Sequence, residues 1–156
     1  MDYDSSTEEL TPKKKVLFLC TGNSCRSQMA EAIVNVALGD RWQASSAGTQ
    51  PAGYVHPLAL EALAEMGIHH QGRSKLADEF RQVDFDLVVT VCDSAAEECP
   101  LWLGKGVRLH HSFPDPAQSG RIEDFRAVRD AISYEIIALL LKNENTSQEG
   151  PISFNL

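Results

Sequence analysis

The chain has 156 residues, a length that fits one compact domain, and 43% of them are hydrophobic, enough to build a core. Its formal net charge of −8 argues against nucleic acid and anionic membranes as partners. No apolar run approaches the ~20 residues of a membrane span, and the acidic start MDYDSSTEEL is unlike a signal peptide. We therefore expect a cytoplasmic protein, with a monomer as the simplest assembly.

The four cysteines of the chain are expected to be thiols at rest, because the cytoplasm is reducing. They are Cys20, Cys25, Cys92 and Cys99. A disulfide framework is typical of short secreted chains instead.

The first part of the chain alternates predicted strands and helices. A polar tail is expected over residues 1–12, and the apolar run KVLFLC at 15–20 predicts a buried strand. Residues 26–38 carry apolar side chains at helical spacing up to Gly39. The stretch WQASSAG at 42–48 is interpreted as a second strand.

The same alternation continues to the end of the chain. A helix is predicted from Pro57 to a stop at Gly67, where glycine favours termination. The later predicted elements are a strand at 85–92, a helix or helical loop at 93–103, a strand at 107–112, a loop at 114–120 and a helix at 122–142. Residues 143–156 form a polar extension, so the expected domain is 13–142.

This order predicts an α/β fold with one parallel sheet and helices on both faces. In such folds the ligand site lies at the carboxyl ends of the strands. Cys20 ends the first predicted strand, Cys92 ends the third, and PDPA at 114–117 follows the fourth. These three features therefore fall on one side of the sheet.

The loop CTGNSCRS at 20–27 has the composition of an oxyanion cradle. A loop that enters a helix points backbone N–H groups inward, and the helix dipole adds positive charge. Arg26 offers a planar fork of donors, and the positive surroundings are expected to lower the pKa of a Cys20 nucleophile. Asn23 tolerates left-handed geometry, and Ser27 is expected to donate a hydrogen bond to the thiolate. The oxyanion-binding candidates are Thr21, Gly22, Asn23, Ser24, Cys25, Arg26 and Ser27. The alternative is a buried strand cysteine followed by a surface arginine.

The motif CTGNSCRSQMAEA resembles the signature loop of the low-molecular-weight protein tyrosine phosphatase family, and FPDPA resembles its acid loop. The similarity runs from about Lys14 to Lys142 and implies a four-stranded parallel sheet flanked by helices. It also implies that Cys20 attacks the central atom of an oxyanion while Asp115 protonates the leaving oxygen. Without the resemblance, Pro-Asp-Pro is equally good turn chemistry.

Two further cysteines resemble the redox branch of that family, the thioredoxin-coupled arsenate reductases. They stand in TVCDSAAEECP, and QMAEA after the loop also fits this branch. The resemblance implies a thiol relay in which Cys20 forms an arsenic adduct and Cys92 then attacks Cys20. Cys99 next attacks Cys92, and thioredoxin or another thiol reductant reduces the final Cys92–Cys99 disulfide. The tandem tyrosines of many eukaryotic phosphatases are replaced by Ala117 and Gln118.

Other interpretations stay open at this point. Cys92 and Cys99 can be inert packing residues, and Cys25 is left outside the required set. The chain can then be a phosphatase that acts on phosphomonoesters through a Cys20 phospho-enzyme, or a non-catalytic anion-binding or redox-sensing module.

No cofactor or metal is expected. Some relatives bind a monovalent cation beside the loop, and Asn23, Glu31 and Ser46 correspond to its ligands. His69 stands where a further acidic ligand is expected, which argues against a potassium site here. The adjacent histidine pairs lack a second ligand set at metal spacing, and Trp42 and Trp102 are interpreted as packing residues.

Overall fold

The computed structural model describes residues 12–100, 103 and 106–144. The elements in chain order are β1 (Lys14–Cys20), α2 (Arg26–Ala37), β2 (Trp42–Gly48), α3 (Pro57–Ala64), a 3-10 helix (Ala77–Phe80), β3 (Leu87–Thr90), α4 (Asp93–Glu98), β4 (Val107–His110), a second 3-10 helix (Pro116–Gln118) and α5 (Ile122–Lys142). The predicted tail at 1–12 and the extension at 143–156 lie almost wholly outside the described residues, as does Trp102.

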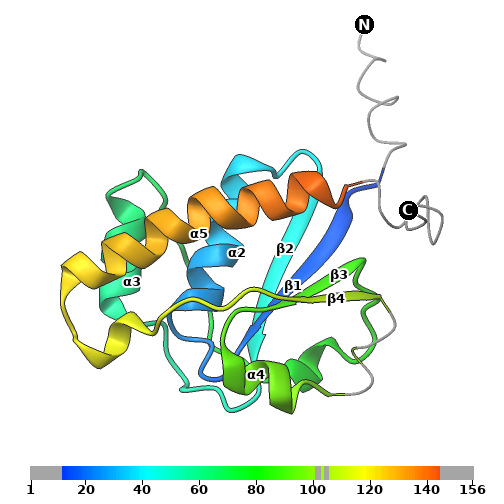
Figure 1. Ribbon diagram of the computed structural model, residues 1–156, viewed down its shortest axis with the longest axis horizontal. Coiled ribbons are helices and arrows are strands. Elements are labelled where there is room, and N and C mark those ends of the chain that lie inside the picture. Colours follow the sequence, from blue (N-terminus) through cyan, green and yellow to red (C-terminus); the bar gives the residue numbers. More distant parts are fainter. Residues whose placement is uncertain (1–11, 101–102, 104–105, 145–156) are drawn as a thin grey trace, which may run out of the picture.

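The four strands form one parallel sheet in the order β2-β1-β3-β4, which confirms the expected fold class. β1 is therefore a central strand, with β2 on one side and β3 on the other (Figure 1). The register pairs Cys20 with Gly48 and Leu19 with Thr90. The carboxyl ends of β1 and β3 thus meet at the same place.

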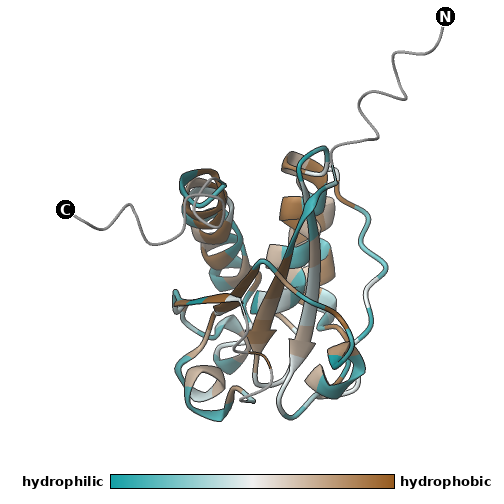
Figure 2. Ribbon diagram, turned by 90° about the vertical axis from the view of Figure 1, so that its right-hand side faces the viewer, coloured by the Kyte–Doolittle hydropathy of each residue, from teal (hydrophilic) through white to brown (hydrophobic). Residues whose placement is uncertain are grey.

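The core lies between the sheet and the long helices. Residues Val16 to Cys20 are all buried, as are the four residues of β3, which is the continuous apolar pattern of a central parallel strand. Figure 2 shows this hydrophobic colouring along the central strands. α2 packs against β1, β2 and α5, while α4 packs against β1 and β3. Trp42 is 1% exposed and belongs to this core, as predicted.

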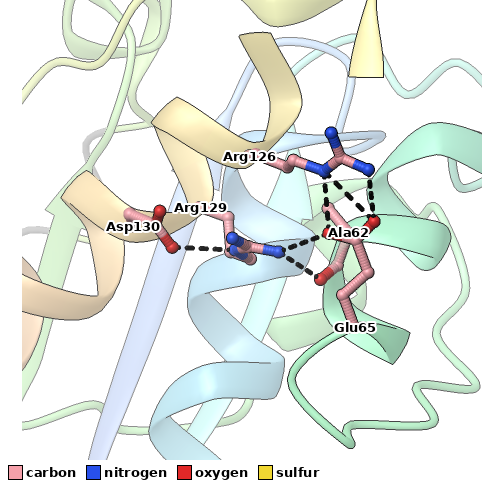
Figure 3. A network of polar contacts seen from close by, with 5 residues as sticks. All are labelled: Ala62, Glu65, Arg126, Arg129 and Asp130. Atoms are coloured by element: carbon pink, nitrogen blue, oxygen red, sulfur yellow. Dashed lines mark hydrogen bonds and ion pairs between the residues drawn. The ribbon is translucent and has the colours of Figure 1, made fainter. Parts of the chain in front are cut away.

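An ion-pair network connects the carboxyl end of α3 to α5 (Figure 3). The carboxylate of Glu65 accepts two hydrogen bonds from Arg126 Nε and one from Arg126 Nη2, and a further bond from Arg129 Nη1. Arg129 Nη1 also donates to the carbonyl oxygen of Ala62, and Arg129 Nε donates to Asp130. The hydrogen bonds from Arg126 and then Arg129 lower the pKa of Glu65 to about 2.

The segment 93–103, predicted as a helix or helical loop, begins as the helix α4. α4 ends at Glu98, and Cys99 leaves the helix with ψ 125°. The physical reason is Pro100, because the ring of a proline disfavours helical geometry at the residue before it. Cys99 therefore lies beyond the helix end and not on its face. Within the described part of the chain, no helix has the length and apolar character needed to cross a membrane.

Candidate active site

The loop between β1 and α2 is built around Asn23. This residue has φ 50°, the left-handed conformation that the sequence predicted, and it is fully buried. Its Nδ2 donates to Ser27 Oγ at 2.8 Å and to Ser46 Oγ at 3.0 Å. Its Oδ1 accepts from the backbone N–H of Lys75 at 3.0 Å and from Gln28 Nε2 at 3.1 Å. The loop therefore closes around one saturated amide.

Neighbouring segments hold the loop from outside. The N–H groups of Gln50, Ala52 and His56 donate to the carbonyl oxygens of Thr21, Gly22 and Ser24 respectively. Ser74 Oγ donates to the Gly22 carbonyl oxygen at 3.0 Å. These contacts occupy the carbonyl groups of the loop on the side of its neighbours. Gly48 is required nearby, because an added Cβ would lie 2.5 Å from the Thr21 carbonyl oxygen.

Arg26 is the first residue of α2 and lies at the mouth of this loop. Its Nη1 donates to the Phe113 carbonyl oxygen at 3.0 Å, and its Nη2 lies 3.9 Å from Asp115 Oδ2. Its Nε is buried and makes no hydrogen bond among the described residues. A buried donor without a partner is costly, so this N–H fits an oxyanion bound in the cradle.

The two cysteines at the ends of β1 and β3 share a hydrogen bond. This bond is the largest influence on both thiols: it raises the pKa of Cys20, together with burial, and lowers the pKa of Cys92 to about 5. The hydroxyl of Thr21 also lies 3.4 Å from Cys92 Sγ and supports the Cys92 thiolate. The sequence-based expectation of a lowered pKa at Cys20 is therefore wrong.

The reason is competition between two close sulfurs for one negative charge. Arg26 favours the Cys20 thiolate, but burial and the neighbouring Cys92 outweigh it. Between the pKa of Cys92 and that of Cys20, the pair carries one proton and one negative charge, whereas two isolated thiols would both be protonated over most of this range. A proton moved from Cys20 to Cys92 would transfer the charge to the nucleophile that faces Arg26.

Cys99 follows α4 and lies apart from this pair. It is half-buried, and burial raises its pKa although Arg108 lowers it. All four cysteines are free thiols, as expected. Cys25 is buried as well, and burial raises its pKa to about 11.

Asp115 caps a turn and also approaches Arg26, while its role as a general acid stays a prediction. Its Oδ1 accepts from the backbone N–H of Ala117 at 3.0 Å and so caps the 3-10 helix at Pro116. Its other oxygen faces Arg26, and about a third of the side chain is exposed. The carboxyl group therefore lies at the mouth of the cradle. The predicted bond from Ser27 to Cys20 stays a prediction, since the Ser27 hydroxyl is placed by Asn23.

The residues named for a cation lie together beside the loop. Ser46 Oγ donates to Glu31 and accepts from Asn23. The positive charge of Lys75 also acts near Glu31, where burial lowers the lysine pKa and Glu31 opposes that shift. His69 is exposed, while His70 Nε2 hydrogen bonds to Gln28 Oε1. The described residues contain no group of three or more His, Cys, Asp or Glu placed to hold a metal.

Sequence analysis missed two polar contacts at the ends of α4. Thr49 Oγ1 donates to Glu98 Oε1 at 2.7 Å, and His110 Nε2 lies 2.9 Å from Asp93 Oδ1. The partners are 49 and 17 residues apart in the chain. No local spacing rule links residues at such distances, although Asp93 and Glu98 stand in the segment already singled out for its cysteines.

Comparisons with known proteins agree with this geometry. Residues 15–149 match the family described as low molecular weight phosphotyrosine protein phosphatase. An arsenate reductase from Halalkalibacterium halodurans is 43% identical over 130 residues, which cover 80% of this chain and 93% of that protein.

Solved structures of arsenate reductases and of low molecular weight phosphatases both resemble this chain. The structure described as an arsenate reductase in the phosphate binding state superposes with a TM-score of 0.74 at 30% identity, covering 83% of this chain and 98% of that one. A low molecular weight protein tyrosine phosphatase from T. tengcongensis gives 0.69 at 31% identity, with 83% and 99% covered.

Proposed function

Because the chain belongs to the low molecular weight phosphotyrosine protein phosphatase family, we propose that it is an arsenate reductase that converts arsenate to arsenite and serves arsenic detoxification. One observation carries this choice within the family. Cys92 hydrogen bonds to Cys20 at the oxyanion cradle. Hydrolysis needs one sulfur there, whereas reduction of arsenate needs a second thiol beside the first.

Arsenate resembles phosphate in shape and charge, so the same cradle accepts it. The N–H groups at the start of α2 and the free Nε of Arg26 supply donors to its oxygens. The donor set fits a tetrahedral dianion without a metal or an organic cofactor. Thr21 to Ser27 would thereby surround the anion, with Cys20 beneath its central atom.

The first chemical step is attack by the Cys20 sulfur on arsenic. The Cys20 proton passes to the Cys92 sulfur, which leaves the Cys20 thiolate beside Arg26. An As–S bond forms and an As–O bond breaks. Asp115, at the mouth of the cradle, gives a proton to the oxygen that leaves as water.

The next step reduces the arsenic. Cys92 loses its proton and attacks the Cys20 sulfur, the S–As bond breaks, and its electron pair stays on arsenic. Arsenic gains two electrons and leaves as arsenite, while the two thiols lose two electrons and become a disulfide. The Thr21 hydroxyl favours the attacking thiolate.

Cys99 then completes the relay by attacking Cys92 and freeing Cys20. A disulfide between residues 92 and 99 leaves the cradle, where an external dithiol can reduce it. Thioredoxin is the proposed electron donor. The proposed relay uses only thiols and requires no cofactor. The coupling to thioredoxin rests on the resemblance of the cysteine pair and on the position of Cys99 outside the core of the site.

The test is arsenate-dependent oxidation of reduced thioredoxin, with glutaredoxin and glutathione compared as alternative donors. Wild type should consume one dithiol for each arsenite formed. Cys92→Ser and Cys99→Ser should stop turnover, while Ser94→Ala, a change at an exposed residue between the two cysteines, should retain it. Turnover by Cys92→Ser at the wild-type rate would rule out the relay.

A phosphatase is the second candidate, because Asp115 beside Arg26 would also serve the hydrolysis of a phosphomonoester. Cys20, Arg26 and Asp115 are sufficient for phosphomonoester hydrolysis through a phospho-enzyme. The T. tengcongensis phosphatase shares the fold at similar identity. Rapid hydrolysis of an aryl phosphate that survives loss of Cys92 and Cys99, without arsenate turnover, would establish this function instead.

A further inference from the structure

α4 separates the two thiols that the final disulfide must join. Cys92 precedes the helix and Cys99 follows it. Seven residue steps at a helical rise of about 1.5 Å place their Cα atoms ~10 Å apart along the axis, although the last step leaves the helix. A disulfide needs its Cα atoms within about 7 Å. The helix must therefore open before Cys99 can bond to Cys92.

α4 has few contacts of its own that stabilise the helical conformation. It contains six residues, of which Ala95 is the buried one. Isolated helices of this length are not stable in water, so tertiary contacts determine whether α4 persists. Two side-chain contacts, one at each end of α4, supply this hold; we call them the Glu98 clamp and the Asp93 clamp.

The Glu98 clamp joins the last residue of the helix to the loop after β2. Thr49 Oγ1 donates to Glu98 Oε1 at 2.7 Å. The backbone N–H of Thr49 donates to the Cys20 carbonyl oxygen at 3.2 Å. Thr49 thereby connects the carboxyl end of α4 to the backbone of Cys20.

The Asp93 clamp joins the first residue of the helix to the end of β4. His110 Nε2 lies 2.9 Å from Asp93 Oδ1, and His110 Nδ1 lies 2.7 Å from Thr90 Oγ1. A carboxylate only accepts hydrogen bonds, so His110 Nε2 carries a proton and donates it to Asp93. Because β4 and β2 are the two outer strands, the clamps hold α4 across the whole carboxyl side of the sheet.

We infer that Thr49, Glu98, Asp93 and His110 are positioning residues for the last internal step of the relay. Closed clamps keep Cys92 beside Cys20 while arsenate reacts, and their release limits the attack of Cys99. In that step Cys99 gives its proton to solvent and attacks Cys92 Sγ. The Cys20–Cys92 bond breaks and its electron pair leaves on Cys20, so no net oxidation occurs. This inference rests on the proposed function.

The first experiment follows the two disulfides in a single turnover. Reduced protein is mixed with one equivalent of arsenate, quenched in acid, alkylated and analysed by mass spectrometry. Thr49→Val and Glu98→Ala should each convert the 20–92 disulfide to the 92–99 disulfide about three to ten times faster, since each loses one exposed hydrogen bond. His110→Ala loses its bonds to Asp93 and Thr90 and should accelerate the conversion at least as much. Formation of the 20–92 disulfide should be no faster in Thr49→Val and Glu98→Ala than in wild type, because the closed clamps favour that step.

Two controls separate the clamps from general effects on the helix. Glu97→Ala makes the same change one residue earlier and should convert at the wild-type rate. The double variant of Thr49→Val with Glu98→Ala should be no faster than either single variant, because both remove the same bond. Wild-type rates in all the clamp variants, equal acceleration by Glu97→Ala, or additive effects in the double variant would each overturn the inference.

A second measurement needs no arsenate. Amide exchange over residues 94–98 in the reduced protein should be faster in Thr49→Val and Glu98→Ala than in wild type and Glu97→Ala. If wild type forms no 20–92 disulfide with arsenate but these exchange rates differ as stated, the proposed function fails while the clamps stand. Equal exchange in all four proteins would remove the clamps whatever the protein does with arsenate.

Discussion

Arg26 donates through Nη1 to the carbonyl oxygen of Phe113 at 3.0 Å. This bond joins the start of α2 to the segment that carries Asp115 two residues later. The guanidinium therefore does two things at once: it faces the anion cradle and it sets the distance between the cradle and the acid. A lysine ammonium has neither the planar fork nor a second donor held in a fixed direction.

Arg26→Lys should lower the kcat/KM for arsenate by at least about 100-fold, because it loses charge-assisted bonds on both sides of the guanidinium. Phosphate binding measured by calorimetry should weaken in parallel. Arg121→Lys, a change at an exposed arginine before α5, is the control. Near-normal anion affinity in Arg26→Lys would contradict the cradle assignment.

Asp115→Asn should slow formation of the Cys20 adduct by about 10²–10³, the usual contribution of a general acid. Phosphate affinity and the unfolding midpoint should change little, since asparagine can still cap the 3-10 helix. Stopped-flow single turnovers give the rate, with Asp124→Asn at the exposed start of α5 as control. An unchanged rate would leave Asp115 with only its capping role.

The shared charge of Cys20 and Cys92 predicts a particular thiolate titration. Absorbance at 240 nm should show one thiolate with a pKa of about 5, because the pKa values of Cys20, Cys25 and Cys99 are raised. Below that pH the resting Cys92 thiolate is protonated and can no longer accept the proton of Cys20, so formation of the Cys20 adduct should slow as the solution is acidified.

The Cys92→Ala variant tests the origin of that charge. It removes the hydrogen bond that raises the pKa of Cys20 most, while Arg26 stays in place. The pKa of Cys20 should therefore fall, which alkylation rates against pH can measure. A Cys20 thiol that titrates as high as in wild type would show that Cys92 does not control it.

Asn23 should be the most sensitive polar residue of the loop. Asn23→Ala removes four hydrogen bonds of a buried amide and places alanine at φ 50°, so we expect a loss of about 2–4 kcal/mol in the free energy of unfolding. Asn23→Gly accepts the same φ and isolates the loss of the side chain. Urea unfolding compares the two; equal stability of Asn23→Ala and wild type would contradict the central place of this amide.

Glu65→Gln should destabilise the contact of α3 with α5 in a pH-dependent way. The pKa of Glu65 is lowered to about 2 in the folded protein from a usual value of 4.5. Its stabilisation is therefore present above pH 4.5 and disappears as the pH falls toward 2. The difference in Tm between wild type and Glu65→Gln should shrink from pH 7 to pH 3. Glu61→Gln, on the same helix, should show a smaller difference at pH 7.

The sequence predicted the parts of the site that depend on neighbours in the chain. An apolar run followed by Gly, Asn and Arg identified the cradle, and Asn23 was recognised as the residue that tolerates left-handed geometry. The placement of Cys20, Cys92 and Asp115 on one side of the sheet followed from the alternation of strands and helices. These inferences need only local propensity and the handedness of parallel connections.

The other features of the site depend on which strands are neighbours in the sheet. The alternation of strands and helices along the sequence does not reveal the strand order. The contact of Cys92 with Cys20 exists because β3 lies next to β1, and this contact reverses the expected pKa values. The sequence leaves the end of α4 open, because it favours either a helix or a helical loop there. Pro100 disfavours helical geometry at Cys99, so the helix ends at Glu98.

The adjacency of β1 and β3 also separates two kinds of chemistry along the gene. Anion recognition and nucleophilic attack reside in the turn after β1, and electron transfer resides in a turn some seventy residues later, on the next strand of the sheet. Neither backbone has to be rebuilt when a sulfur is gained or lost after β3. A hydrolase and an oxidoreductase can therefore share one cradle and differ by thiols in the segment from the end of β3 to the end of α4, which gives a physical reason for finding both activities among proteins of this shape.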